Sequence, residues 1–170
     1  MQQYTELALR TLVSGTFNPD KVPAAELTDI MVDVQQITEV TDRLKKALIY
    51  GKDMGEFEGD DATEMFAHLN PDLVHGILGL FTEAGELMVA LSQAVFNKTP
   101  IDMVNLREEF GDTMWYQAVI SHVAGFTFEE AGLTNIAKLA KRYPERFTPE
   151  LALNRDIAAE RQILENEVGA

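Results

Sequence analysis

Two pairs of acidic residues, each with a spacing of three, are the part of this sequence best suited to chemistry. Glu83 and Glu86 lie in LFTEAGELMVALSQAV, a stretch that is otherwise mostly apolar or small, and Glu109 and Asp112 lie in NLREEFGDTMWY. On a helix, residues three apart are separated by about 60° around the axis and about one turn along it, so each pair shares one face. Ionised carboxylates in apolar surroundings are costly to leave unpaired. We therefore expect a cation among them.

The short connection between the two segments predicts how the carboxylates are arranged, and their oxygen atoms indicate the type of cation. Two helices joined by a short turn pack antiparallel, which would bring the four carboxylates together in one groove. Carboxylate oxygens are preferred ligands of Mg²⁺, and Mn²⁺ is a possible substitute. Acidic residues three or four apart are also common on exposed helix faces, so a solvated surface is the alternative. Two such pairs on successive apolar helices favour the metal site.

The composition limits the class of protein. With 170 residues, 46% of them hydrophobic, the chain is predicted to form one compact domain over residues 1–170. It has no cysteine and three histidines, so a metal site would depend mainly on oxygen ligands. The net charge of −14 opposes binding to a nucleic-acid duplex, but metal-bound phosphates remain compatible with it. No apolar run approaches the roughly 20 residues of a membrane helix and no signal peptide is recognisable, so a cytoplasmic protein is predicted.

Helical periodicity dominates the sequence, which predicts an all-α fold of about five to six helices. Glycine and acidic residues predict an exposed loop at about residues 51–63. The expected helices are a short one at 4–13, long ones at 24–50, 71–96 and 100–124, one between Thr127 and Pro144, and one from Pro149 onward. The predicted buried stripes of the three long helices are Leu27, Ile30, Val34, Ile37, Leu44 and Leu48; Ile77, Phe81, Ala84, Met88, Leu91 and Val95; and Met103, Leu106, Phe110 and Met114.

Three motifs in order, GLFTEAGELMVAL, NLREEFGDTMWY and NIAKLAKRYPERF, resemble the MazG-like nucleotide pyrophosphohydrolases of the all-α NTP pyrophosphatase superfamily, whose hallmark is ExxE followed by ExxD. The resemblance runs from YTELALRT to ALNRDIAAER and leaves out residues 16–65. It implies a helical bundle in which the metal ligands and catalytic residues are Glu83, Glu86, Glu109 and Asp112. It also implies Mg²⁺-dependent hydrolysis of a nucleoside or deoxynucleoside triphosphate to the monophosphate and pyrophosphate, by water attack at the α-phosphate. One of these carboxylates, or Glu108, would accept the proton.

The resemblance implies further contacts with the substrate. Asn135 and Lys138 match residues that lie near the phosphates in the family, and Tyr143 closes the same motif. Trp115 follows the second acidic pair and would flank the base or ribose, although an aromatic residue at this position also suits a core. His75 is either a substrate contact or an interior histidine. The family also implies a homodimer or homotetramer.

Three other interpretations remain open at this level. The first is a relative with a narrower substrate, such as dUTP, dCTP or phosphoribosyl-ATP, because the base preference is not visible in the residues. The second is a di-iron carboxylate bundle, whose Glu-x-x-His signature this sequence lacks. The third is a non-catalytic helical interaction module with residues 24–50 as its surface, although two intact acidic pairs would then have no role.

Overall fold

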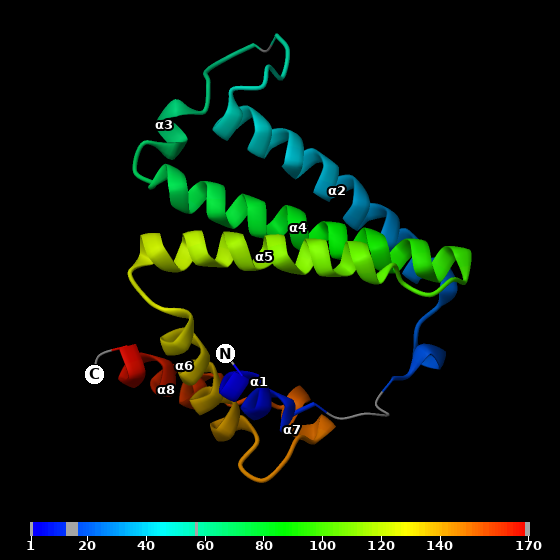
Figure 1. The fold of residues 1–170 in the computed structure, drawn as a ribbon, viewed down its shortest axis with the longest axis vertical. Helices are drawn as coiled ribbons and strands as arrows, with labels where there is room; N and C mark the ends of the chain where they lie inside the picture. The colour runs from blue at the N-terminus through cyan, green and yellow to red at the C-terminus, as the bar shows by residue number, and fades with distance from the viewer. Residues whose placement is uncertain (1, 13–16, 57, 169–170) are drawn as a thin grey trace. The chain divides into compact units, whose positions relative to one another are not determined.

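The computed structural model describes residues 2–12, 17–56 and 58–168, and in these ranges it contains eight α-helices and no strand (Figure 1). The predicted all-α fold is confirmed, although the helices outnumber the five to six expected. Contacts divide the chain into a central unit, Asp20–Gly125, and a terminal unit formed by Met1–Pro19 and Phe126–Ala170. We describe each unit by itself, and the single domain over 1–170 stays a prediction.

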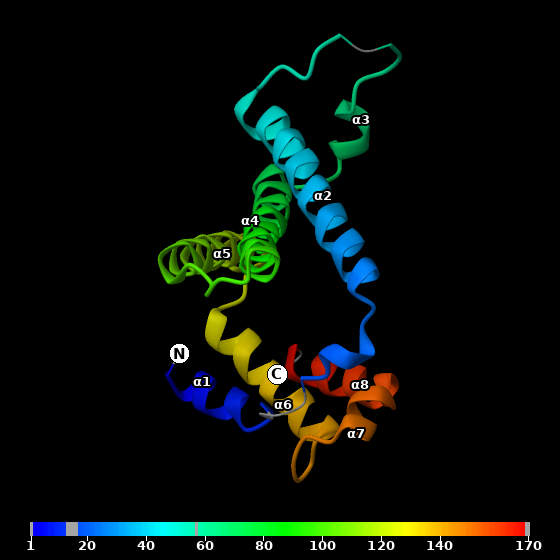
Figure 2. The same cartoon turned by 90° about the vertical axis from the view of Figure 1, so that its right-hand side faces the viewer.

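The central unit is built on three long helices. They are α2 (Ala24–Tyr50), α4 (Pro71–Asn97) and α5 (Met103–Ala124), with the short α3 (Thr63–Phe66) before α4. Helix α4 packs against both α2 and α5, and Figures 1 and 2 show α4 and α5 running antiparallel along each other. A 3₁₀ turn at Pro19–Lys21 leads into α2. Residues 51–62 contain no helix, and those of them that the structure describes are exposed.

Side-chain caps fix the ends of α4 and α5. Asn70 Oδ1 accepts hydrogen bonds from the backbone of Asp72 and Leu73, so α4 starts at the predicted proline. Helix α5 starts later than predicted. Asp102, rather than Thr99 and Pro100, provides its cap, because Asp102 Oδ1 accepts from two backbone N–H groups of the first turn.

The predicted buried stripes on these helices are wrong for most of their residues. The residues that α4 buries are small or polar: Gly76, Gly79, Thr82, Gly85, Ala90 and Ser92. Most of the large apolar residues predicted to be buried are exposed in the single chain: Ile30, Ile37, Leu44, Leu48, Ile77, Phe81, Leu91, Val95, Met103 and Phe110. The physical reason is that α4 lies very close to its neighbours, and only small side chains fit between such helices. Apolar periodicity identifies the hydrophobic face of a helix, but it does not show which face packs against the neighbouring helices of the same chain.

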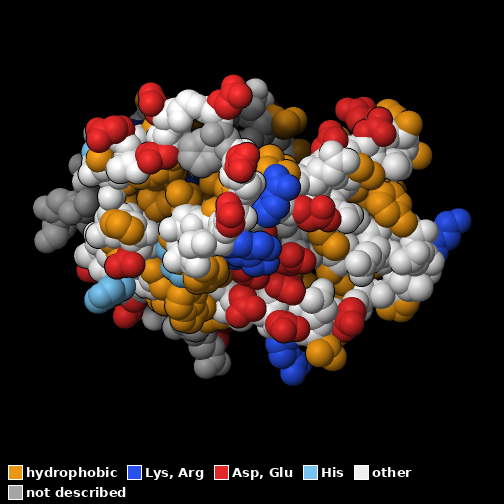
Figure 3. Space-filling view, turned by 90° about the horizontal axis from the view of Figure 1, so that it is seen from above, with side chains coloured by type: hydrophobic (Ala, Val, Ile, Leu, Met, Phe, Trp, Pro, Cys, Tyr) orange, Lys and Arg blue, Asp and Glu red, His pale blue; other side chains and the backbone are white. Residues whose placement is uncertain are grey.

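Because of these exposed apolar residues, the surface combines hydrophobic areas with charged ones. Figure 3 shows hydrophobic areas among acidic side chains on the face that it draws. An exposed apolar surface of this extent suits contact with another protein chain. The predicted homo-oligomer, which light scattering at working concentration would test, remains a prediction.

One glycine shows how close α2 and α4 are. A Cβ on Gly85 would lie 2.1 Å from Thr38 Oγ1 and 2.8 Å from Thr38 Cβ. Thr38 is itself buried and donates to the Val34 carbonyl at 2.8 Å, so it cannot turn away without losing that bond. We expect Gly85→Ala to lower the free energy of unfolding by about 1–3 kcal/mol, in spite of the better helix propensity of alanine.

Urea unfolding followed by Trp115 fluorescence would measure this change. The matched control is Gly111→Ala on α5, where a Cβ would meet nothing within 4 Å. The control should be neutral or more stable, by up to about 1 kcal/mol. Equal stability of the Gly85→Ala and Gly111→Ala variants would contradict the close approach of α2 and α4.

By length and composition, α4 is the one helix among the described residues that could cross a membrane. Glu83 and Glu86 lie near its middle, and it packs against α2 and α5 along its length. These features are typical of a core helix in a helical bundle.

The terminal unit contains α1 (Gln2–Leu9), α6 (Phe128–Arg142), α7 (Pro149–Leu153) and α8 (Ile157–Val168), with α6 in contact with α1 and α8. Thr127 and Glu130 form the predicted capping box of α6. The single helix expected from Pro149 onward is instead broken into α7 and α8. Asn154 ends α7, and Asp156 Oδ1 accepts from the backbone of Ala159 at 3.0 Å to start α8.

Candidate metal centre

Three of the four predicted carboxylates lie together. Glu83 of α4 and Glu109 and Asp112 of α5 each have an oxygen within 4.8 Å of the others. The antiparallel packing of α4 and α5 produces this group, because it places the middle of one helix beside the middle of the other. Three hard oxygen donors at this separation match the ligand set that Mg²⁺ or Mn²⁺ prefers.

Glu109 is the least exposed of these carboxylates. The residue is 9% exposed, and its Oε1 accepts a hydrogen bond from Asn105 Nδ2 at 2.8 Å. Burial raises the pKa of Glu109 above its ordinary value; the Asn105 amide opposes this shift, and the neighbouring Glu83 and Glu86 add to it. The carboxylate is therefore oriented by a hydrogen bond but under-compensated in charge. A bound cation would relieve that cost.

Glu86, the fourth predicted ligand, is not in this group of oxygens. It is exposed one turn further along α4 and lines a polar pocket of about 430 Å³ beside the turn between α4 and α5. Asn105, the partner of Glu109, lines the same pocket, together with Gln93 and Asn97. The pocket therefore adjoins the carboxylate group and is lined mainly by polar side chains.

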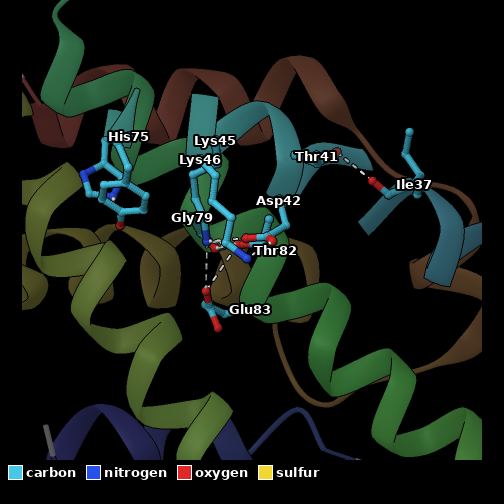
Figure 4. A network of polar contacts seen from close by, with 10 residues as sticks. Ile37, Thr41, Asp42, Lys45, Lys46, His75, Gly79, Thr82 and Glu83 are labelled. Carbon is cyan, nitrogen blue, oxygen red and sulfur yellow. Dashed lines mark hydrogen bonds and ion pairs between the residues drawn. The ribbon is translucent and has the colours of Figure 1, made fainter. Parts of the chain in front are cut away.

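A lysine from α2 supplies a positive charge next to Glu83. Lys45 Nζ lies 2.8 Å from Thr82 Oγ1, 3.4 Å from Glu83 Oε1 and 3.4 Å from Asp42 Oδ1 (Figure 4). The Thr82 hydroxyl has two candidate acceptors for its single hydrogen, the Gly79 carbonyl at 2.8 Å and Glu83 Oε1 at 3.2 Å. Lys45 and Thr82 are both buried.

Aromatic residues extend from this lysine to the surface. Lys45 Nζ lies 5.5 Å from the ring centroid of the buried Tyr116, whose ring is in edge contact with His75 and Trp115. His75 also meets Tyr50 of α2, with 3.3 Å between its Nε2 and the phenol oxygen. Trp115 is 53% exposed. The tryptophan is thus packed on one side and open on the other, as a base-stacking residue would be.

The predicted phosphate-binding residues belong to the terminal unit. Asn135 and Lys138 are half-buried on α6. Tyr143 ends α6 and is buried, with Phe147 and the Arg142 guanidinium in contact with its ring. Tyr143 therefore has a packing role within its own unit, whatever else it contacts.

Sequence reasoning missed two residues near the carboxylates. Asn105 lies four residues before Glu109, which is the spacing of a helical hydrogen bond between side chains and could have been recognised. Lys45 is 38 residues from Glu83 in sequence, and no local pattern connects them. Only the packing of α2 against α4 brings them together.

Comparison with known families assigns the segment that holds these carboxylates. Residues 75–147 match the MazG nucleotide pyrophosphohydrolase domain. Neither a curated protein nor a solved structure gives a match. The matched segment contains both acidic pairs and the basic face of α6, but none of α2. The resemblance is therefore confirmed over residues 75–147, the segment that matches the MazG nucleotide pyrophosphohydrolase domain.

Proposed function

We propose that the protein is a Mg²⁺-dependent pyrophosphohydrolase of nucleoside or deoxynucleoside triphosphates, which releases the monophosphate and pyrophosphate. The observation that carries the proposal is the convergence of Glu83, Glu109 and Asp112 inside a domain of the MazG family. The all-oxygen donor set fits a hard divalent cation. The raised pKa of Glu109, caused by burial and by its acidic neighbours, indicates that this carboxylate lacks a compensating positive charge of its own.

The carboxylates would hold and orient the ion, with Glu86 joining from the next turn of α4. When bound, Mg²⁺ would neutralise phosphate oxygens and lower the pKa of a water positioned for attack at the α-phosphate. The Asn105 amide donates a hydrogen bond of 2.8 Å to Glu109 and orients this carboxylate, as outer-shell partners of metal ligands do. A carboxylate of the group, or Glu108, would take the proton from the attacking water.

The proposed substrate contacts are of two kinds. Asn135, Lys138 and Tyr143 are proposed to bind phosphates, since an amide, an ammonium and a phenol all donate to phosphate oxygens. Trp115 is proposed to stack on the base, which its exposed ring supports. The polar pocket beside Glu86 supplies space and amide groups next to the proposed metal ligands.

The test is product analysis by chromatography. The full chain is incubated with each common NTP and dNTP, with Mg²⁺ or with EDTA. We expect monophosphate and pyrophosphate to appear only with the metal, and the relative rates to rank the bases. Diphosphate with free phosphate would show cleavage of a different bond and would contradict the proposed chemistry, as would turnover that persists in EDTA.

A further inference from the structure

Lys45 is fully engaged in a network that reaches the proposed metal site. An ammonium has three N–H donors, and Lys45 has three acceptors in reach: Thr82 Oγ1, Glu83 Oε1 and Asp42 Oδ1. Its side chain is 7% exposed. Figure 4 shows the side chain pointing from α2 toward Thr82 and Glu83 of α4. With two hydrogen bonds, one further ion pair and little exposure, Lys45 is placed to act on Glu83 rather than on a substrate phosphate.

The charge of this lysine is maintained despite its burial. Burial opposes the charged form, but the carboxylates of Glu83 and Asp42, each 3.4 Å from Nζ, favour it. Two carboxylates therefore lie beside a permanent ammonium. The neighbouring Lys46 differs, because it pairs with Asp42 rather than with Glu83 and its side chain is 44% exposed.

The packing of α2 on α4 fixes where this charge lies. Met31, Thr38 and Lys45 are the buried residues of α2, and they recur at every seventh position on one face. Thr38 faces Gly85, and one repeat later Lys45 faces Thr82, three residues earlier on α4. The close approach at Gly85 thus sets the register that places the ammonium at Glu83. Helix α2, which carries this charge, lies outside residues 75–147, the segment that matches the family.

We propose that Lys45 is a built-in counter-cation of the metal site, which holds Glu83 in place when the site is empty and lowers the site's affinity for free divalent ions. The inference rests on the proposed metal function of Glu83. An ion on Glu83 would have the ammonium as a near neighbour, because the ammonium lies 3.4 Å from the same carboxylate. Like charges repel, whereas a triphosphate brings its own negative charge with the ion. The site is therefore biased toward a metal that arrives with the nucleotide.

The experiment measures Mn²⁺ binding to the full chain by calorimetry, without nucleotide. At a separation of about 5 Å, even the dielectric constant of bulk water leaves a repulsion between +1 and +2 charges equivalent to roughly tenfold in affinity. We therefore expect Lys45→Met and Lys45→Gln to bind Mn²⁺ roughly tenfold more tightly than the parent protein. Lys45→Arg should stay close to the parent, because it keeps the charge. The matched control is Lys46→Met, which removes the adjacent charge and should also leave the affinity unchanged.

Thermal unfolding gives a second readout, in which the size of the metal-dependent rise in Tm distinguishes a counter-cation from a merely structural lysine. Lys45→Met should be less stable than the parent in EDTA, and saturating Mn²⁺ should raise its Tm by more than it raises the parent's Tm. Lys45→Gln keeps a donor for Thr82 or Glu83, so it tests the charge even if the methionine variant does not fold. Unchanged or weaker Mn²⁺ binding in the neutral variants would overturn the inference. Absence of Mn²⁺ binding to the parent protein would instead overturn the proposed metal site itself.

Discussion

Replacing Glu109 by glutamine is expected to lower kcat/KM for pyrophosphate release by at least about 100-fold, since even outer-shell partners of a metal ligand contribute about 10–100-fold. The substitution keeps the shape of the side chain and an oxygen that can accept from Asn105, but it removes the charge that a divalent ion requires. Glu109 is the proposed ligand whose charge is least compensated, because burial and the neighbouring Glu83 and Glu86 raise its pKa.

The same substitution separates catalysis from folding. Because the folded state disfavours the charged form of Glu109, the neutral glutamine should not lower the free energy of unfolding in EDTA. Initial rates with saturating Mg²⁺, together with urea unfolding in EDTA, measure the two effects. The control is Glu39→Gln, which removes one charge from an exposed residue on α2 and should keep full activity. Retained activity in Glu109→Gln would exclude this carboxylate as a ligand; lost activity together with lost stability would point to a structural role.

The approach of three of the four predicted carboxylates was predictable from sequence because its geometry is mostly local. Residues three apart on one helix share a face whatever the helix packs against, so Glu109 and Asp112 had to lie together. A short turn between α4 and α5 then brings Glu83 close. The expectation that a cation lies near the carboxylates was also sound physically, yet the sequence could not name Lys45. That contact depends on the register of α2 against α4, which is set by a small pair, Thr38 and Gly85.

The buried faces were less predictable, for a related reason. Helix α4 has glycines on one face and large apolar residues on another, and either face can pack against a neighbouring helix. The periodicity of Ile77, Phe81 and Leu91 identifies the more apolar face, but α4 packs inside this chain through the face of Gly79 and Gly85. Helix ends were easier, because a cap such as Thr127 with Glu130 acts through the nearest backbone N–H groups.

Replacing Glu160 by glutamine is expected to destabilise the terminal unit by about 3 kcal/mol, because removing one partner of a buried ion pair leaves the other uncompensated. Glu160 is 4% exposed by its side chain and binds two guanidinium groups, with Arg142 Nε at 2.8 Å and Arg155 Nη2 at 2.7 Å. The Arg142 pair connects α6 to α8 within the terminal unit, whereas Arg155 lies in the connection between α7 and α8. Hydrogen exchange of the α6 and α8 amides would measure the loss locally, whereas Trp115 fluorescence reports on the central unit and should not change.

The stability that Glu160 gives to the terminal unit should decrease as the pH falls. Arg142 and Arg155 hold the pKa of Glu160 at about 2 in the folded chain, against an ordinary value of 4.5. A depressed carboxyl pKa stabilises the folded state fully above the unfolded value, and that stabilisation is lost as the pH falls from about 4.5 toward 2. Protection of α6 and α8 should therefore fall over this range in the parent protein, and the part due to Glu160 should be absent from Glu160→Gln.

A matched control on the same helix distinguishes burial from charge. Glu165 pairs with Arg161 on α8, but both side chains are largely exposed, at 60% and 71%. Exposed pairs contribute little, so Glu165→Gln should change the stability by no more than about 0.5 kcal/mol and should leave the acid sensitivity intact. If both glutamine variants lose the same protection, the effect comes from the net charge of α8. If only Glu160→Gln loses it, the pair of the buried Glu160 with Arg142 holds α8 to α6, the helix that carries Asn135 and Lys138.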